Sequence, residues 1–78
     1  MPPAALILDL PVHRDPEILG GTPVFRGTRV PFQTLLDYLE AGDPLDEFLE
    51  DFPSVSREQA VAALDAARDL VFAQLGVR

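Results

Sequence analysis

The stretch that most constrains this chain is Gly20–Pro31, which reads Gly-Gly-Thr-Pro-Val-Phe-Arg-Gly-Thr-Arg-Val-Pro. Val24-Phe25 and Arg29-Val30 have the composition of short strands, and an Arg-Gly-Thr turn signal separates them. Gly27 can take a positive φ without steric cost, as a tight turn usually demands. Pro31 suits the first turn of a helix. The stretch therefore predicts a small β-hairpin that leads directly into a helix.

Most residues of this motif are explained by the turning and stiffening of a structured connector: Gly20, Gly21, Pro23, Gly27, Thr28 and Pro31. That interpretation does not explain why two arginines flank the turn in a chain of net charge −7. Arg26 and Arg29 are therefore candidate contacts to phosphate or to a partner protein. The structural alternative is that each arginine pairs with one of the thirteen acidic residues of the chain.

The length of 78 residues predicts a single domain with a small core and marginal stability. We divide it into a strand-and-hairpin arm, 1–31, and a three-helix bundle, 32–78. The sequence has no cysteine, so a disulfide cannot supply stability. Association with a second copy or with a partner would supply it instead. The sequence shows neither a secretory signal nor a membrane-spanning run, so we expect a cytoplasmic protein.

The arm and the bundle are both delimited by local signals. A strand is expected at Ile7–Leu10, ended by Pro11. Three helices are expected over 32–41, over 44–51 and from the N-cap Ser56 to Leu75, with Gln59 completing a capping box. The fold class predicted is mostly α, with a short N-terminal strand, a β-hairpin and a homeodomain-like bundle. The apolar faces of the helices predict one core: Leu36, Leu39, Phe48, Leu49, Leu64 and Val71.

The last predicted helix is apolar or small over more than half of its circumference, which two short helices cannot cover. Its main stripe would face the core. A second patch predicts a face buried against another copy or a partner: Ala62, Ala66, Leu70 and Ala73. The alternative for the alanines is that alanine is simply a good former of surface helix. The patch predicts a homodimer.

The second and third helices are joined by a short turn, which is the skeleton of a helix-turn-helix motif. Arg57 and Gln59, at the start of the third helix, are residue types that read guanine and adenine. Glu58 and the acidic preceding helix oppose entry into a DNA groove, so a purely structural bundle is the favoured interpretation. With this net charge, the chain alone is expected to bind DNA weakly at best.

No catalytic or metal-binding pattern is present in the sequence. His13, the single histidine, has no second histidine or nucleophile at a useful spacing, and we expect it at the surface. The acidic residues of the second helix are expected to be solvated rather than to bind metal. We therefore predict a protein that is not an enzyme and needs no cofactor.

The run from Asp15 to Pro31 resembles the signature of domain-of-unknown-function family 433. The later spacing agrees with that resemblance: Leu35-Leu36, Gly42, Leu45, Phe48-Leu49, Phe52-Pro53, Ser56 and Ala62-Ala63-Leu64. The resemblance implies a homeodomain-like helical part, a bacterial or archaeal source and no catalytic residues. Members are often described as antitoxins encoded beside a nuclease-like protein of the PIN type.

The function predicted is therefore that of an antitoxin that neutralises a PIN-type nuclease toxin and, as a dimer, binds its own promoter. Two alternatives stay open. One is a stand-alone helix-turn-helix-like DNA-binding regulator, and the other is a structural or assembly module.

Overall fold

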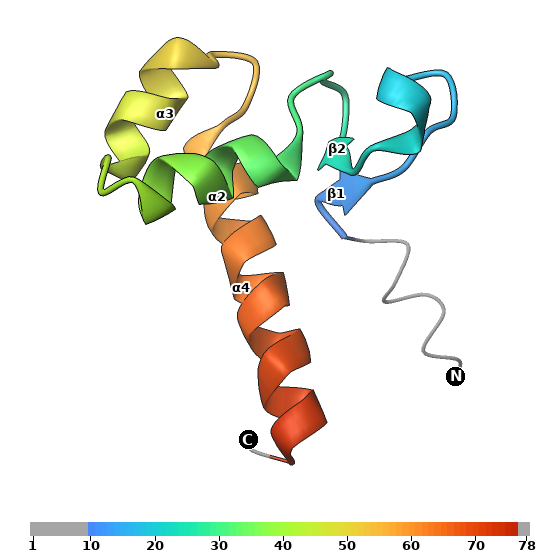
Figure 1. Cartoon of the computed structure of the whole chain (residues 1–78), viewed down its shortest axis with the longest axis vertical. Helices are drawn as coiled ribbons and strands as arrows, with labels where there is room; N and C mark the ends of the chain where they lie inside the picture. Colours follow the sequence, from blue (N-terminus) through green and yellow to red (C-terminus); the bar gives the residue numbers. More distant parts are fainter. Residues whose placement is uncertain (1–9, 77–78) are drawn as a thin grey trace.

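The computed structural model describes residues 10–76, which form two short strands and three α-helices (Figure 1). Strands β1 (Val12–His13) and β2 (Val24–Phe25) pair antiparallel, with Val12 opposite Phe25. A short 3-10 segment, η1 (Leu19–Gly21), lies between them in the chain. The helices follow in order as α2 (Phe32–Glu40), α3 (Leu45–Asp51) and α4 (Arg57–Leu75).

The predicted fold class is confirmed, and the helices begin and end within about a residue of the expected positions. Ser56 is the N-cap of α4, because its Oγ accepts a hydrogen bond of 3.0 Å from the Gln59 backbone N–H. Gly42 follows α2 with φ 89°, and Gly76 ends α4 with φ 74°. Both are left-handed positions at which glycine carries little strain.

The first strand differs from the prediction. Residues 7–9 of the expected strand Ile7–Leu10 lie outside the described residues, and Leu10 is in no strand. The observed strand β1 follows Pro11 instead of ending there. Pro11 lacks an N–H but keeps its carbonyl, which accepts a 2.9 Å hydrogen bond from the Arg26 backbone N–H. The proline therefore starts the pairing with the hairpin.

The hairpin of Gly20–Pro31 forms, but its return arm is shorter than expected. Gly27 has φ 77° at the turn, and the Thr28 N–H donates to the Phe25 carbonyl at 3.0 Å. Arg29-Val30 is not a strand, because the return arm pairs with β2 only through a single bridge between Val24 and Pro31. The predicted positive φ of Gly27 is confirmed, and the hairpin is stabilised by pairing with β1 of its own chain.

The core is built where β2 meets the helices. Its buried residues come from the strand, from all three helices and from the α3–α4 connector: Phe25, Leu35, Phe48, Val55, Ala60 and Ala63. The Phe48 ring lies 6.1 Å from Phe25, 5.5 Å from Tyr38 and 5.1 Å from Phe52, measured between ring centroids. These spacings are typical of stabilising aromatic pairs, so Phe48 is the centre of the core.

The predicted core was correct for Phe48 but wrong for two other residues. Leu39 is 37% exposed and Val71 is 54% exposed. Leu36 is half-buried, and Leu49 and Leu64 are half-buried against the core. For Val71, the reason is that the second half of α4 runs beyond the other helices (Figure 1), so this residue has no neighbours among them to pack against. Leu39 lies in the last turn of α2.

A hydrogen bond between Tyr38 of α2 and Asp51 of α3 ties these two helices together. The Tyr38 hydroxyl donates to the Asp51 carboxylate at 2.6 Å. This hydrogen bond, with a smaller contribution from desolvation, raises the pKa of Tyr38 to about 12. The Tyr38 hydroxyl is therefore protonated near neutral pH and can donate the hydrogen bond to Asp51.

Candidate functional site

The glycine pair of the motif has a structural role. Leu19, Gly20 and Gly21 all have positive φ, at 50°, 66° and 91°. Gly21 is buried, and its carbonyl accepts a 2.7 Å hydrogen bond from the Arg14 Nε. A Cβ at Gly21 would lie 3.4 Å from the Arg14 guanidinium. The loop between the strands is thus closed by a contact that favours glycine at this position.

Arg26 and Gln59 hold the hairpin against the rest of the chain. The Arg26 Nε donates to the Leu10 carbonyl at 2.5 Å. The Gln59 side-chain amide donates to the Arg26 carbonyl at 3.0 Å and, more weakly, to the Pro11 carbonyl at 3.4 Å. The sequence predicted that the Gln59 side chain completes a capping box, and this prediction is wrong. Instead, Gln59 ties the start of α4 to the hairpin.

The other two candidate nucleic-acid contacts lie in different surroundings. Arg57 forms an ion pair with Asp46 of α3, and both side chains are more than half exposed, so the pair contributes little to stability. Arg29 is exposed and makes no hydrogen bond or ion pair within residues 10–76. Of the four candidate residues, Arg26, Arg57 and Gln59 thus have partners in their own chain.

Single alanine variants are expected to separate the two hairpin arginines. Arg26→Ala should lower the free energy of unfolding by about 1 kcal/mol, because it removes the hydrogen bond to the Leu10 carbonyl. Arg29→Ala should change it by less than about 0.5 kcal/mol, as is usual for an exposed side chain without a partner. Urea titrations of both variants measure this. Equal losses would mean that Arg29 is also a structural residue.

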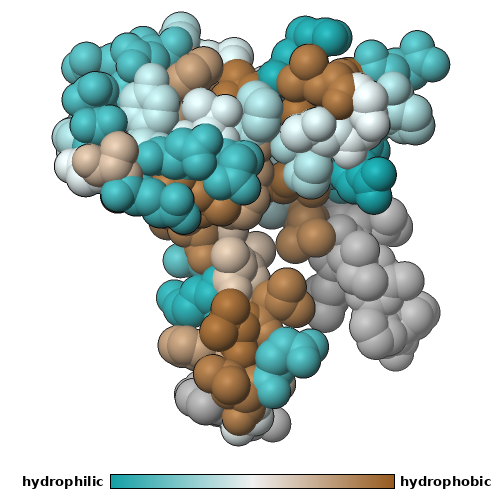
Figure 2. All heavy atoms as spheres, in the orientation of Figure 1, coloured by the Kyte–Doolittle hydropathy of each residue, from teal (hydrophilic) through white to brown (hydrophobic). Residues whose placement is uncertain are grey.

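The second half of α4 is the most apolar exposed surface in the described part of the chain. Its large side chains are all substantially exposed: Leu70 64%, Val71 54%, Phe72 41% and Leu75 71%. In Figure 2 these hydrophobic residues gather on the part of the helix that projects from the body. A helix end that is apolar nearly all round is usually buried against something, and large exposed apolar patches mark interaction sites.

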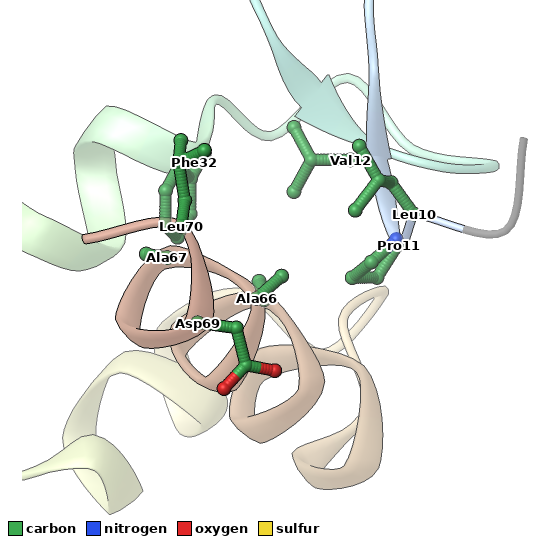
Figure 3. Close-up of a pocket in the computed structure, with 9 residues that line it drawn as sticks. Leu10, Pro11, Val12, Phe32, Ala66, Ala67, Asp69 and Leu70 are labelled. Atoms are coloured by element: carbon green, nitrogen blue, oxygen red, sulfur yellow. The ribbon is translucent and has the colours of Figure 1, made fainter. Parts of the chain in front are cut away.

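One side of α4 forms the wall of an apolar groove of about 660 Å³ (Figure 3). The segment Leu10–Val12 forms the opposite wall. The residues that line the groove are Leu10, Pro11, Val12, Phe32, Ala63, Ala66, Ala67, Asp69 and Leu70. Asp69 is the only ionisable group among them, and its carboxylate accepts two hydrogen bonds from Arg68, at 3.0 and 3.1 Å. Arg68 also lies 3.6 Å from the Asp65 carboxylate, so one guanidinium is shared by two carboxylates.

The predicted dimer or partner face falls partly on this groove. Ala66 and Leu70 line it, whereas Ala62 and Ala73 are exposed and do not. The residues that sequence reasoning missed are those of the opposite wall, Leu10–Val12, and Phe32. No periodicity could have found them, because they lie more than thirty residues away in the chain.

The opposite side of α4 is a second exposed surface, which we call the outer face: Glu58, Val61, Asp65 and Phe72. At about 100° per residue, Val61 and Phe72 lie on the other side of the helix from Leu70. Val61 is 40% exposed and Phe72 is 41% exposed. Glu58 and Asp65 are exposed beside them on the same side of the helix. The outer face thus combines an aromatic side chain with carboxylates.

The structure gives no positive sign of a metal site or of a membrane segment. Among residues 10–76, no group of three or more histidines and carboxylates is placed to hold a metal ion. No helix in that range is both long enough and apolar enough to cross a membrane. His13, expected at the surface, is half-buried in β1, and its Nε2 is buried without a hydrogen-bond partner in the described part.

Together these features define a small, mostly helical domain with an N-terminal hairpin and two exposed surfaces on α4. Residues 12–66, over two-thirds of the chain, match the family model described as protein of unknown function (DUF433). The chain belongs to this family. The predicted family resemblance is thereby confirmed.

Two proteins resemble this chain, one in structure and one in sequence. A crystal structure of a DUF433 member from Anabaena variabilis ATCC 29413 has a TM-score of 0.66 and 30% identity, covering 85% of this chain and 65% of that one. The uncharacterized protein y4eO of Sinorhizobium fredii (strain NBRC 101917 / NGR234) is 46% identical over 48 residues, 62% of this chain. The match spans only 22% of that relative, and less than two-thirds of the crystallised one.

Proposed function

We propose that this chain is a non-catalytic binding protein that captures a partner protein through the outer face of α4. The observation that carries the proposal is the combination of exposed Val61 and Phe72 with Glu58 and Asp65 on that face. Aromatic side chains are frequent anchors of protein interfaces. Carboxylates around such an anchor select a partner with a basic surface.

The partner proposed is a nuclease toxin of the PIN type, which makes this chain an antitoxin. The family resemblance suggests that class, and charge supports it. A nuclease must hold a phosphate backbone, so its substrate surface is basic. This chain carries a net charge of −7. The exposed acidic residues of α3 add to the negative potential: Asp46, Glu47, Glu50 and Asp51. Such potentials speed association and favour correct partners. The pair would act in the cytoplasm, with the RNA.

Inhibition of the nuclease tests this proposal. The purified chain is titrated into a PIN-type nuclease encoded beside it, and cleavage of a fluorogenic RNA is followed. We expect stoichiometric inhibition by the native chain. Phe72→Asp should weaken inhibition by at least about 10-fold, because it removes an anchor and buries an unpaired charge. The matched control Ser54→Asp adds the same charge to the exposed α3–α4 connector and should inhibit normally.

Two outcomes would contradict the proposal. One is equal inhibition by the Phe72→Asp and native chains, provided that thermal melts show both folded. The other is no inhibition together with tight, salt-sensitive binding of promoter DNA by the chain alone, which would favour a DNA-binding regulator. Promoter binding by the antitoxin itself belongs to the proposal only as a weaker activity. Its arginine contacts would be Arg29 and the guanidiniums of Arg26 and Arg57.

A further inference from the structure

The described part of the chain begins in the wall of the apolar groove. Leu10, its first residue, lines the groove opposite Leu70 (Figure 3) and is 41% exposed. The Leu10 carbonyl accepts a 2.5 Å hydrogen bond from the Arg26 Nε. The next carbonyl, that of Pro11, accepts a 2.9 Å hydrogen bond from the Arg26 backbone N–H. The residues that precede Leu10 are therefore attached to the groove at a fixed point.

The sequence just before Leu10 is as apolar as the groove. It contains the run Leu6-Ile7-Leu8, which lies outside the described residues. The groove is lined by aliphatic, aromatic and alanine side chains, apart from Asp69. Burial of apolar side chains against such walls is favourable. A segment that is already attached at the groove also loses less translational and rotational freedom on binding than a separate molecule does.

The run has the reach and the size to occupy the groove. On α4 the groove extends from Ala63 to Leu70, which is about 10 Å along the helix axis. An extended chain spans at most about 3.5 Å per residue, so Leu8 lies within about 7 Å of Leu10 and Leu6 within about 14 Å. The groove volume of about 660 Å³ falls in the range of pockets that bury a small-molecule ligand. It has room for two leucine side chains.

The residue order decides which side chains of the run would enter. Leu10 precedes a proline, which restricts its backbone to extended conformations. In an extended chain, residues two positions apart point to the same side. Leu8 and Leu6 then share the side of Leu10. Ile7 and Asp9 point to the opposite side, which keeps the Asp9 carboxylate away from Asp69.

We propose that the groove is filled by Leu6 and Leu8 of the same chain. A second copy would have to bring another net charge of −7 to the same place, which the attached segment does not. Ala66 and Leu70, predicted from the sequence as part of a dimer face, would then be covered within one chain. The outer face of α4 stays open, so this inference is independent of the nuclease and goes beyond the proposed function.

Thiol labelling of the full chain tests whether the run covers the groove, because the sequence has no native cysteine. Ala66→Cys places a single thiol in the groove, and its reaction with N-ethylmaleimide is followed. Adding Leu8→Ser should speed labelling by at least about 5-fold, because a hydroxyl without a partner is unfavourable in an apolar groove. The matched control Ile7→Ser should leave the rate unchanged. Equal rates for the two serine variants would overturn the proposal.

Disulfide trapping in dilute solution tests which chain supplies the run. Leu8→Cys and Leu70→Cys in one chain should form a disulfide within the monomer when oxidised glutathione is added. Two control pairs should react at least about 10-fold more slowly: Ile7→Cys with Leu70→Cys, and Leu8→Cys with Phe72→Cys on the outer face. Controls that react as fast, or disulfide-linked dimers as the main product, would contradict the proposal. Neither experiment contains the nuclease, so this inference and the proposed function can fail separately.

Discussion

Replacing Phe48 with alanine is expected to lower the free energy of unfolding by about 3–5 kcal/mol. Phe48 is fully buried, and its ring contacts the rings of Phe25, Tyr38 and Phe52. The truncation therefore removes apolar burial and three aromatic contacts, and it opens a cavity between β2 and the helices. A chain of 78 residues has a total stability of only about 4–12 kcal/mol. The variant should thus be largely unfolded near 37 °C.

The matched control is Leu39→Ala, on a helix that contacts the same core. Leu39 is 37% exposed, so its truncation should cost less than half as much as that of Phe48. Thermal and urea melts of both variants, followed by circular dichroism, give the comparison. If the two substitutions cost the same, the core lies where the helical periodicity had placed it, and the observed packing around Phe48 is wrong.

The helices could be predicted well because their ends depend on local chemistry. The sequence shows a serine at the start of α4 and a glycine at its end. In the structure the serine hydroxyl accepts a backbone N–H, and the glycine takes a positive φ. The core could not be predicted as well. Periodicity identifies the apolar side of a helix but not the point at which its neighbours stop. For that reason Val71 was assigned to the core, although it lies beyond the body.

The candidate site was harder to predict, because its parts come from distant segments. Arginine and glutamine suggested nucleic-acid contacts by residue type. In the structure, the Gln59 amide donates to the Arg26 carbonyl across 33 positions of the chain. No local pattern specifies such a contact. The groove is similar, since its two walls come from opposite ends of the chain. The sequence predicted the helical wall, at Ala66 and Leu70, because only in that wall do small and apolar residues recur at helical spacing.

The two exposed sides of α4 differ in chemistry. Its groove side is apolar apart from the Asp69 carboxylate. Its outer face carries Glu58 and Asp65 beside Phe72, which suits a basic partner. Because Leu70 and Phe72 lie on opposite sides of the helix, a substitution at either residue changes only one of the two surfaces.

The second large effect is expected at the hairpin turn, where Gly27→Val should lower the free energy of unfolding by about 2–3 kcal/mol. Gly27 has φ 77°, a conformation that strains a β-branched residue. A Cβ built at this position meets nothing within 4 Å. The loss would therefore come from the backbone and not from a clash. The turn matters because it follows two residues whose positions are important. Phe25 packs in the core, and the Arg26 carbonyl accepts a hydrogen bond from the Gln59 amide.

Gly27→Asn is the control that isolates the cost of placing a β-branched residue at a positive φ. Asparagine is polar and branched at Cγ, but it is enriched in the left-handed region, so it should cost about 1 kcal/mol or less. Urea titration of both variants gives the difference. A valine that is tolerated as well as asparagine would show that the turn can relax to a negative φ. In that case the hairpin would not be held by Gly27, and the positions of Phe25 and the Arg26 carbonyl would depend on the pairing of β1 with β2 and on the Gln59 amide.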